Sequence, residues 1–441
     1  MQLRKKHFYG DEMNILITGG NGFVAREIII ALELQGHKIT ACIRNFSTRV
    51  LENESVKFIQ IDFKNNTDKS FWISHLKNID VVINCVGVFQ TATEKEMWAI
   101  HYDAPTALFE ACVDAGVKKI IHISALGVDK SDVTYAKSKL AAEKYLQNLN
   151  IDSVIIRPSF VYGHGSYGGS SLFRGLCGLP FFIFLPGGGK KLLQPLHVHD
   201  LVKIIQHSLN LSGKHLLSAG GSEKLSLKDI LIKLRAWLGF KKAINFSVPL
   251  IFIKITAKFG DFFRNAPLSS TGVKLMAMDN VLTNQEFENL TKTVSFTPRS
   301  FTQGLNNMVS AVQDRWHARL FFLRPLLRLS IAYLWIFSGI ISLVAANIFS
   351  YPMLERMNIN SPLKIILLFG ASGLDILLGF AVLFNYRLKI IGSIQVALMI
   401  IFTIITSFYL QIYWLFPFAP IAKNIPLIFA TLVMMALESD R

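Results

Sequence analysis

Three residues in the first half of the chain have types and a spacing suited to proton transfer. Tyr135 and Lys139 are four residues apart in the segment Tyr-Ala-Lys-Ser-Lys, and Ser124 lies eleven residues upstream of Tyr135. Side chains four residues apart project from the same face of a helix, so the phenol and the ammonium would be neighbours. Such a tyrosine could exchange a proton with a substrate alcohol or carbonyl, while Ser124 orients the reacting oxygen. We therefore predict Ser124, Tyr135 and Lys139 as catalytic residues.

The ionisation of Tyr135 decides whether this chemistry works near neutral pH. A neighbouring ammonium and the positive charge of a nicotinamide both favour the phenolate, so both are expected to lower the pKa of Tyr135 below its ordinary value. A tyrosine and a lysine at this spacing also occur by chance. The prediction therefore depends on the nucleotide-binding motif that precedes the pair.

A glycine-rich turn near the N-terminus has the form of a dinucleotide-binding fingerprint. An apolar strand over residues 14–18 leads into Gly19-Gly-Asn-Gly22, and a helix is predicted from residue 23 to 35, with Ala25 in place of the third glycine. A second strand over residues 38–43 completes a βαβ unit of about 30 residues, in which the glycines let a pyrophosphate approach the helix N-terminus. The predicted contacts are Thr18, Gly19, Asn21, Gly22, Phe23 and Val24.

The end of the second strand indicates which dinucleotide is bound. An acid there binds the ribose 2′-hydroxyl, whereas a basic residue accommodates a 2′-phosphate. The strand ends in Cys42-Ile-Arg44-Asn45 without an acid, and a guanidinium suits phosphate. NADP(H) is therefore predicted in preference to NAD(H), with a surface arginine as the alternative. Further predicted contacts are Asp62 to the adenine amino group, Val86 and Gly87 in the cleft, Lys139 to the nicotinamide ribose, and Pro158.

Apolar strands alternate with helical stretches along this part of the chain. Further strands are predicted at residues 56–59, 81–86, 119–124 and 153–157. This alternation predicts an α/β fold, a Rossmann-type doubly wound parallel sheet. We expect a basic tail at residues 1–12, a NAD(P)-binding domain at 13–320, and a small substrate subdomain within it at about 160–310.

The remainder of the chain consists of long apolar runs. Those at residues 326–349, 363–384 and 388–412 reach the ~20 residues that a membrane-spanning helix needs. A shorter run, extended to residues 421–438, is predicted as a fourth span. Buried core helices are the alternative, but a soluble domain rarely contains three such runs in succession. Residues 321–441 are therefore predicted to be an all-α, four-helix transmembrane domain.

Basic residues predict how the spans are oriented. They gather at two places on one predicted side of the membrane. Arg315, Arg319, Arg324 and Arg328 lie at the approach to the first span, and Arg387 and Lys389 lie in the tight connection between the second and third. Because cytoplasmic loops carry the excess of Lys and Arg, the N-terminal domain and the C-terminus are predicted to be cytoplasmic, at the inner cell membrane. Asp375 lies near the middle of a span, where a carboxylate suggests a function, or else a hydrogen-bonded aspartate that holds helices together.

Composition narrows the expected partners. The 441 residues carry a net charge of +16, of which +12 falls on residues 1–320. Beside membrane spans this charge fits an anionic lipid surface better than nucleic acid. The predicted partners are thus the lipid bilayer and a lipophilic small molecule, with no nucleic acid. The four cysteines form no CxxC pair and are expected to be reduced thiols.

Three other segments have weaker signals. His197, His199 and Asp200 could ligate a metal, but their alternation on a predicted strand favours a structural role, and no metal is predicted. Pro186-Gly-Gly-Gly-Lys-Lys191 lacks the order of a P-loop and is predicted to be a loop of the substrate subdomain. Residues 246–263 mix apolar and basic positions, which suits an amphipathic helix at the bilayer or the substrate cleft, or a plain buried helix.

Several short motifs accompany the proposed catalytic residues. They are Thr18–Ala25, Asn84–Gly87, Ile123–Gly127, Tyr135 with Lys139, Ile156–Pro158, Val161–Gly163 and Gln194–Asp200. Together they resemble the short-chain dehydrogenase/reductase superfamily in its extended and atypical branches. Within that superfamily, the sequence is similar to the branch that contains the NADPH-binding accessory subunit of respiratory complex I. The C-terminal 120 residues resemble the DoxX-like membrane family. The resemblance implies cytoplasmic NAD(P) binding with a membrane anchor, and allows epimerase- or dehydratase-like chemistry.

His101 departs from this resemblance. The family usually has an asparagine at this position that supports a proton relay, and a histidine can also hydrogen-bond and carry protons. The sequence leaves three functions open. The first is a membrane-anchored NAD(P)H-dependent oxidoreductase acting on a lipophilic carbonyl, alcohol or quinone-like compound. The second is a non-catalytic NADP(H)-binding assembly or sensor protein, and the third is a proton or ion site at Asp375 regulated by the dinucleotide.

Overall fold

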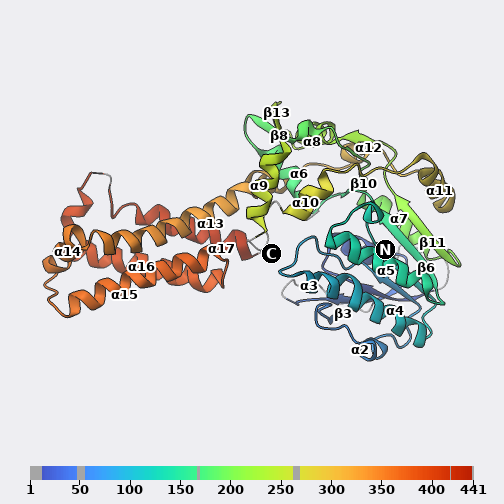
Figure 1. Cartoon of the computed structure of the whole chain (residues 1–441), viewed down its shortest axis with the longest axis horizontal. Helices are drawn as coiled ribbons and strands as arrows, with labels where there is room; N and C mark the ends of the chain where they lie inside the picture. Colours follow the sequence, from blue (N-terminus) through green and yellow to red (C-terminus); the bar gives the residue numbers. More distant parts are fainter. Residues whose placement is uncertain (1–11, 47–54, 166–168, 262–268, 418, 440–441) are drawn as a thin grey trace, which may run out of the picture. The chain divides into compact units, whose positions relative to one another are not determined.

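The chain forms two compact units in the computed structural model. The structure describes residues 12–46, 55–165, 169–261, 269–417 and 419–439, so the predicted basic tail lies almost wholly outside the described residues. The first unit comprises residues 1–318 and the second residues 319–441. Every described strand belongs to the first unit, and the second is helical (Figure 1).

Seven parallel strands form the central sheet of the first unit. They are β1 Asn14–Thr18, β2 Lys38–Ile43, β3 Val56–Gln60, β4 Val81–Asn84, β5 Lys119–Ile123, β6 Asp152–Pro158 and β11 Lys214–Ala219. Their spatial order is β11-β6-β5-β4-β1-β2-β3, so the chain changes direction across the sheet between β1 and β4. Ligands of such sheets bind outside the carboxyl ends of the strands at this point. The predicted doubly wound parallel sheet is confirmed.

Helices cover both faces of this sheet. In β1, Ile15 and Ile17 face one core and Leu16 faces the other, because side chains alternate along a strand. The first core is closed by α1 Phe23–Leu34, α7 Val198–Ser208 and α11 Asn284–Val294. The second is closed by α2 Lys69–Ile73, α4 Ala104–Asp114 and α5 Thr134–Asn148. Helix α4 is preceded by α3 Glu94–Trp98 and a π-helical turn, η1 Ala99–Asp103, and a 3₁₀ turn, η2 Val128–Lys130, precedes α5.

A smaller subdomain with its own apolar core lies beyond β6. Its strands are β7 Val161–Tyr162, β8 Phe182–Pro186, β9 Leu192–Leu193, β10 Leu196–His197, β12 Leu225–Ser226 and β13 Ile244–Val248. Its helices are α6 Gly169–Gly178, η3 Gly187–Gly189, α8 Leu227–Trp237, α9 Leu250–Gly260, α10 Ser270–Met276 and α12 Phe301–Asn306. The predicted helix over residues 246–263 is wrong at its start, because residues 244–248 pair with β8 as a strand and α9 begins only at Leu250. Residues 262 and 263 lie outside the described ranges.

The second unit is a set of apolar helices. They are α13 Val312–Val344, η4 Ala346–Ser350, α14 Tyr351–Arg356, α15 Leu363–Leu383, α16 Leu388–Tyr409, η5 Gln411–Trp414 and α17 Asn424–Ser439. By length and composition α13, α15 and α16 can each cross a membrane, and α17 is a shorter apolar helix. Arg324 and Arg328 on α13 reach Glu438 on α17 at 3.4 and 3.7 Å, so the start of α13 and the end of α17 lie at the same end of this unit.

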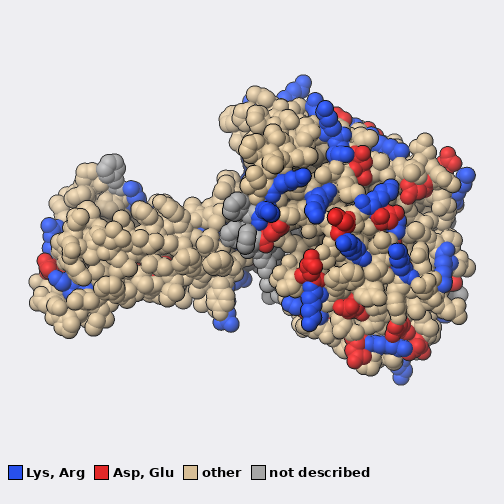
Figure 2. Space-filling model, viewed as in Figure 1, with Lys and Arg blue, Asp and Glu red and all other residues tan. Residues whose placement is uncertain are grey.

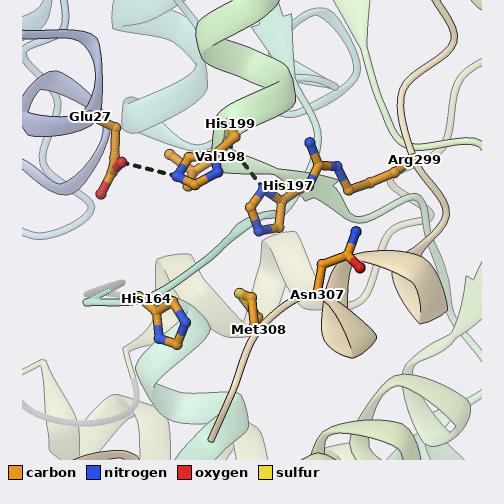
Figure 3. Close-up of a pocket in the computed structure, with 8 residues that line it drawn as sticks. All are labelled: Glu27, His164, His197, Val198, His199, Arg299, Asn307 and Met308. Carbon is orange, nitrogen blue, oxygen red and sulfur yellow. Dashed lines mark hydrogen bonds and ion pairs between the residues drawn. The ribbon is translucent and has the colours of Figure 1, made fainter. Parts of the chain in front are cut away.

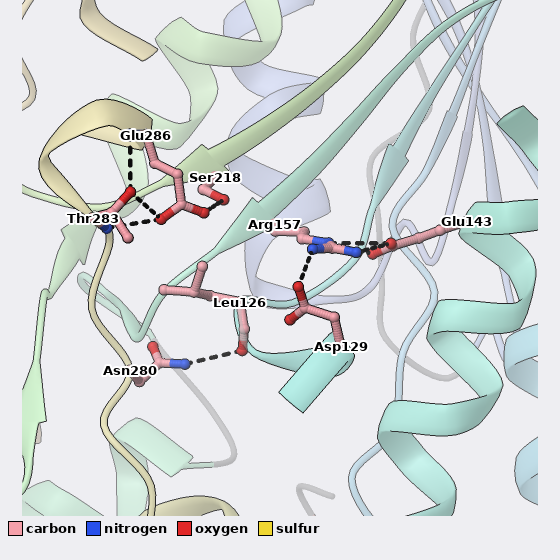
Figure 4. Close-up of polar contacts among 8 residues, drawn as sticks. All are labelled: Leu126, Asp129, Glu143, Arg157, Ser218, Asn280, Thr283 and Glu286. Carbon is pink, nitrogen blue, oxygen red and sulfur yellow. Dashed lines mark hydrogen bonds and ion pairs between the residues drawn. The ribbon is translucent and has the colours of Figure 1, made fainter. Parts of the chain in front are cut away.

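A buried ion pair fastens α5 to the sheet. Arg157 on β6 donates from Nε to Oε1 of Glu143 at 3.0 Å and from Nη2 to Oε2 at 2.6 Å, and from Nη1 to Asp129 at 3.0 Å (Figure 4). The Glu143 side chain is only 1 % exposed. Because Glu143 is one turn beyond Lys139, this pair also fixes the helix that carries Tyr135 and Lys139.

Replacing Glu143 by alanine should destabilise the first unit. The change leaves the largely buried Arg157 guanidinium with Asp129 as its remaining ion-pair partner. Removing one partner of a buried ion pair costs about 3–5 kcal/mol of stability. We expect a clear drop in the thermal unfolding midpoint of the purified full chain, measured by differential scanning fluorimetry. Lys137→Ala on the exposed side of the same helix is the control. Equal midpoints for the two variants would contradict this assignment.

Candidate functional site

Buried hydrogen bonds join the carboxyl ends of β1, β4 and β5. Thr18 Oγ1 donates to Asn84 Oδ1 at 2.6 Å, and Asn84 Nδ2 lies 3.1 Å from Nδ1 of His122. The backbone N–H of Cys85 donates to Thr18 Oγ1, and that of Val86 donates to Asn84 Oδ1. Burial and the nearby Lys139 hold the pKa of His122 well below its usual range, so this imidazole is neutral. The three strand ends that face the predicted cleft are thereby held in register.

The fingerprint turn leaves no space for side chains beside the β4 end. Gly19 has φ +72°, and a Cβ on it would lie 3.3 Å from the backbone of Cys85 and Val86. A Cβ on Gly22 would lie 3.0 Å from the carbonyl oxygen of Gly19. Gly22 is also the N-cap of α1, where no side chain caps the helix and no acid occupies the first turn. Open N–H groups at a helix N-terminus suit a pyrophosphate, so these residues fit a dinucleotide.

The end of β2 is held against this turn. Asn21 Nδ2 donates to the carbonyl of Asn45 at 3.2 Å, and Gln60 Nε2 donates to the carbonyl of Arg44 at 3.2 Å. The Arg44 side chain is exposed. Asp62 accepts a hydrogen bond from the backbone of Lys64 at 3.1 Å, so one of its oxygens shapes the turn after β3. Arg44 is therefore placed by its backbone and is accessible to a ligand.

Lys139 connects the predicted catalytic residues. Its Nζ donates to the carbonyl of Ile123, the residue before Ser124, at 3.0 Å, and lies 5.9 Å from the ring centroid of Tyr135. A Cβ on Gly87 would lie 3.4 Å from the same nitrogen. Burial lowers the pKa of Lys139 to about 8, an effect that Glu143 opposes. The structure thus brings the end of β5, the end of β4 and the start of α5 together around one ammonium.

The pKa of Tyr135 is raised, whereas the sequence predicted that the Lys139 ammonium would lower it. The residue is buried, its ring stacks on Phe89 with centroids 4.8 Å apart, and His101 meets it edge-on at 5.3 Å. Burial raises the pKa of Tyr135 above its ordinary value, and Lys139 does not offset this effect. The expectation that the ammonium lowers this pKa is wrong for the protein by itself, because desolvation penalises the phenolate.

His101 has both ring nitrogens engaged. Nε2 accepts the backbone N–H of Val88 at 3.1 Å, so Nδ1 carries the proton and lies 3.2 Å from the hydroxyl of Ser138. Burial, with Lys139 and His122 nearby, lowers the pKa of His101 to about 2, so the ring stays neutral. In this arrangement His101 braces the loop after β4 against α5, and neither of its nitrogens is available to pass a proton.

Ser124 follows β5 in a loop that the subdomain holds. Its Oγ is buried and has no hydrogen-bond partner among the described residues, so a ligand oxygen could take that position. Asn280 Nδ2 donates to the carbonyl of Leu126 at 3.0 Å (Figure 4). Its Oδ1 accepts from the hydroxyl of Ser159 at 2.6 Å. The sequence reasoning missed Asn280 and Phe89, since no local motif marks either one.

His197 and His199 line a cavity of about 80 Å³ together with Glu27 of α1 (Figure 3). The prediction that both alternate along a strand is wrong. His197 ends β10 and caps α7, accepting the N–H of His199 at 3.1 Å, while His199 lies on the helix 3.2 Å from Glu27. Asp200 accepts hydrogen bonds from the Arg299 side chain through both carboxylate oxygens, from Nη2 at Oδ1 and from Nε at Oδ2. The described residues contain no cluster of His, Cys, Asp or Glu that could hold a metal ion.

Asp375 lies on α15 where it meets α13. A Cβ on Gly339 would lie 3.3 Å from the Cβ of Asp375, which shows how closely the two helices pack. Asp375 Oδ1 is buried and has no hydrogen-bond partner among the described residues. The sequence-based alternatives for this residue, a functional carboxylate or a structural one, stay predictions.

Two family models match separate segments of the chain. Residues 15–216 match the NAD dependent epimerase/dehydratase family, and residues 332–432 match the DoxX-like family. The chain joins an epimerase/dehydratase-family domain to a DoxX-like domain. The predicted resemblance to short-chain dehydrogenases/reductases fused to a DoxX-like domain is thereby confirmed. The family and the fold together indicate a nicotinamide dinucleotide as cofactor, and the DoxX-like domain with its apolar helices indicates a membrane protein.

The individual proteins that this chain resembles are distant in sequence. It is 25 % identical over 202 residues to the rat NADH dehydrogenase [ubiquinone] 1 alpha subcomplex subunit 9, covering 44 % of this chain and 52 % of that protein. It is 28 % identical over 185 residues to the Monkeypox virus 3 beta-hydroxysteroid dehydrogenase/Delta 5-->4-isomerase, covering 34 % and 52 %. The chain thus spans about half the length of these curated relatives. A solved UDP-glucuronic acid 4-epimerase from Bacillus cereus shares the fold, with TM-score 0.52, 19 % identity and coverage of 70 % and 100 %.

Gly19→Ala should weaken dinucleotide binding. The substitution places a Cβ against the β4 backbone at a left-handed φ, so the turn must shift where the pyrophosphate would bind. We expect the Kd for NADPH, measured by isothermal titration calorimetry, to rise by about tenfold or more, which corresponds to ~1.4 kcal/mol. Gly36→Ala is the control, because Gly36 has φ +91° with nothing within 4 Å of the added Cβ. Similar losses of NADPH affinity in both variants would contradict the assignment of this turn to the binding site.

Proposed function

We propose that this protein is an NADP(H)-dependent oxidoreductase that reduces a lipophilic carbonyl compound drawn from the membrane in which it is anchored. The arrangement at the end of β5 carries the proposal. Ser124 Oγ is buried without a partner among the described residues, and Lys139 Nζ is bonded to the carbonyl just before it. Tyr135 lies one turn before Lys139 on α5. At the end of β5 and the start of α5 these residues offer a hydroxyl that can hydrogen-bond a substrate oxygen, a proton donor and a cation.

The protonation states of these groups suit the proposed reduction of a carbonyl. When bound, the dinucleotide would supply the hydride that adds to the carbonyl carbon. Ser124 would donate a hydrogen bond to the carbonyl oxygen, and Tyr135 would transfer its proton to that oxygen to give the alcohol. A raised pKa keeps Tyr135 protonated near pH 7, which is the form that donates. Lys139, with a pKa of about 8, is mostly protonated there; it would return a proton to the Tyr135 phenolate and would then regain one from solvent.

The substrate class follows from the membrane domain and from one relative. A chain with three helices long enough to cross a bilayer meets bilayer-soluble compounds at high local concentration. Its similarity to a protein named as a 3 beta-hydroxysteroid dehydrogenase supports a sterol-like ketone or alcohol among such compounds. We place residues 1–320 and the C-terminus on the cytoplasmic side of the inner membrane. The ion pair between the start of α13 and the end of α17 supports a common side for both.

A second candidate is a non-catalytic NADP(H)-binding assembly or sensor protein. The engagement of both His101 nitrogens favours it, because the position that usually supports a proton relay then has only a structural role. The similarity to a named subunit of NADH dehydrogenase points the same way. Without a relay, Tyr135 and Lys139 would be reprotonated slowly after each reduction. A structural use of the cofactor needs no such relay.

Tyr135→Phe should abolish turnover without loss of cofactor. Since a positioned acid contributes about 10²–10⁴-fold, we expect the rate of NADPH oxidation with sterol ketones in proteoliposomes to fall at least ~100-fold. Tyr145→Phe is the matched control, because its hydroxyl bonds to Glu110 and the residue lies about 15 Å further along the same helix. Undiminished turnover in Tyr135→Phe would refute the mechanism. Tightly bound NADPH without turnover in the native protein across ketones and quinones would instead support the second candidate.

Arg44→Ala should change which dinucleotide is preferred. If the exposed guanidinium binds the 2′-phosphate, its loss removes a charged hydrogen bond of ~1.5–3 kcal/mol, so the Kd for NADPH should rise about tenfold or more. The Kd for NADH should stay nearly constant, because it lacks that phosphate. Lys57→Ala, an exposed cation on the neighbouring strand β3, serves as the control. Equal weakening of both dinucleotides would contradict a 2′-phosphate role for Arg44.

A further inference from the structure

The substrate subdomain exposes a group of large apolar side chains. They are Phe181, Phe182, Phe184, Ile244, Phe246, Leu250, Ile251, Phe252 and Ile255, each at least 36 % exposed. We refer to these nine residues as the β8–α9 patch. Single exposed apolar residues are ordinary, but a contiguous group of this size on one subdomain marks an interaction surface.

Strand pairing places the aromatic residues of the patch together. In the parallel pair of β8 and β13, Phe182 lies opposite Ile244 and Phe184 opposite Phe246, so all four project to one face. The rings of Phe184 and Phe246 are 5.8 Å apart, and those of Phe182 and Phe246 are 6.4 Å apart. The alternate residues of β8, Ile183 and Leu185, are buried in the subdomain core. The outward rings are therefore a second apolar face, with no part in that core.

Helix α9 continues this face. A Cβ on Gly187, directly after β8, would lie 3.4 Å from Cγ of Leu250, so the start of α9 packs against the end of that strand. Ile251, Phe252 and Ile255 are each about half exposed or more. Among the side chains of α9 whose burial the structure describes, Ala257 is the buried one. The strand pair and the helix thus form one surface rather than two separate patches.

Lysines flank the patch residues in the sequence, and one of them, Lys191, lies 3.8 Å from Asp279. Residues 180–192 and 241–261 contain Lys190, Lys191, Lys241, Lys242, Lys254 and Lys258, against the single acid Asp261. The Asp261 carboxylate accepts the backbone N–H of Ser270 at 2.9 Å. Lys254 and Lys258 are exposed on α9 itself, one turn apart. The surface over β8 and β13 is largely uncharged, with blue side chains along its border (Figure 2).

We propose that the β8–α9 patch binds the surface of the bilayer that the same chain spans. Aromatic and aliphatic side chains beside lysines are the combination that enters the headgroup region of an anionic leaflet. A chain with three helices able to cross a membrane keeps this subdomain near a bilayer at all times, so weak contacts suffice to hold it there. The main alternative occupant is a second copy of the chain, paired through the open edge of β13.

The test uses the full chain in nanodiscs that hold one copy each. A nitrobenzoxadiazole probe is attached at Phe246→Cys and, as the control, at Leu34→Cys, which lies on α1 and replaces a residue 83 % exposed. We expect quenching by lipid-borne nitroxides to be about threefold or more stronger at 246 than at 34. The native thiols Cys42, Cys112 and Cys177 are buried, and labelling of the unsubstituted chain supplies the background.

A second variant tests the lysines. Lys254→Glu with Lys258→Glu should reduce quenching at 246 in anionic discs to the level of neutral discs, and high salt should do the same in the native chain. Equal lipid quenching at 246 and 34 would overturn the proposal. If the probe at position 246 is protected from quenching only in discs that hold two copies, the patch instead binds a second copy of the chain. None of these readouts involves turnover, so the result is independent of the proposed reaction.

Discussion

The hydrogen bonds among Thr18, Asn84 and His122 are the interaction on which the site geometry depends. They lie at the carboxyl ends of β1, β4 and β5, which lead respectively into the fingerprint turn, Gly87 and Ser124. A slip of one residue in any of these strands would turn its polar side chain to the opposite face and leave buried partners unsatisfied. The network therefore selects one register, and that register brings the nucleotide turn and the proposed catalytic serine to the same edge of the sheet.

The buried charge of Lys139 is the second constraint. Burial disfavours the ammonium, yet the carbonyl of Ile123 accepts from it, and Glu143 lies one turn further along α5. Glu143 is itself held by Arg157 on β6. The path from β6 through Glu143 to Lys139 keeps an ammonium inside the protein with a pKa near 8, so that it is charged at neutral pH while its proton remains exchangeable. If Lys139 were in a more stable ion pair, it would hold its proton more firmly and would be a poorer donor to Tyr135 in the proposed reaction.

Most of the central sheet could be predicted because parallel strands buried on both faces appear as short, continuous apolar runs. β1 and β2 lie where the sequence indicated, and β3 to β6 differ by one or two residues at their ends. The remaining features depend on tertiary contacts. His197 caps a helix, which a His-Val-His pattern does not distinguish from strand alternation. Phe89 on Tyr135 and Asn280 on Leu126 join residues far apart in sequence, and the direction of the Tyr135 pKa follows from that enclosure.

The β8–α9 patch and the enclosed phenol are consistent with one physical requirement. A lipophilic ketone has little solubility in water, so an enzyme that reduces it benefits when the subdomain that receives the substrate is held at the bilayer surface. The same substrate would bring few polar groups into the site, which leaves Tyr135 in surroundings that favour its neutral, proton-donating form. A polar nucleotide-sugar would require neither feature, since it diffuses from the cytosol and carries its own charges. The exposed rings of β8 and β13 are consistent with the proposed hydrophobic carbonyl substrate, and the buried Tyr135 keeps the protonated form that the proposed reduction needs.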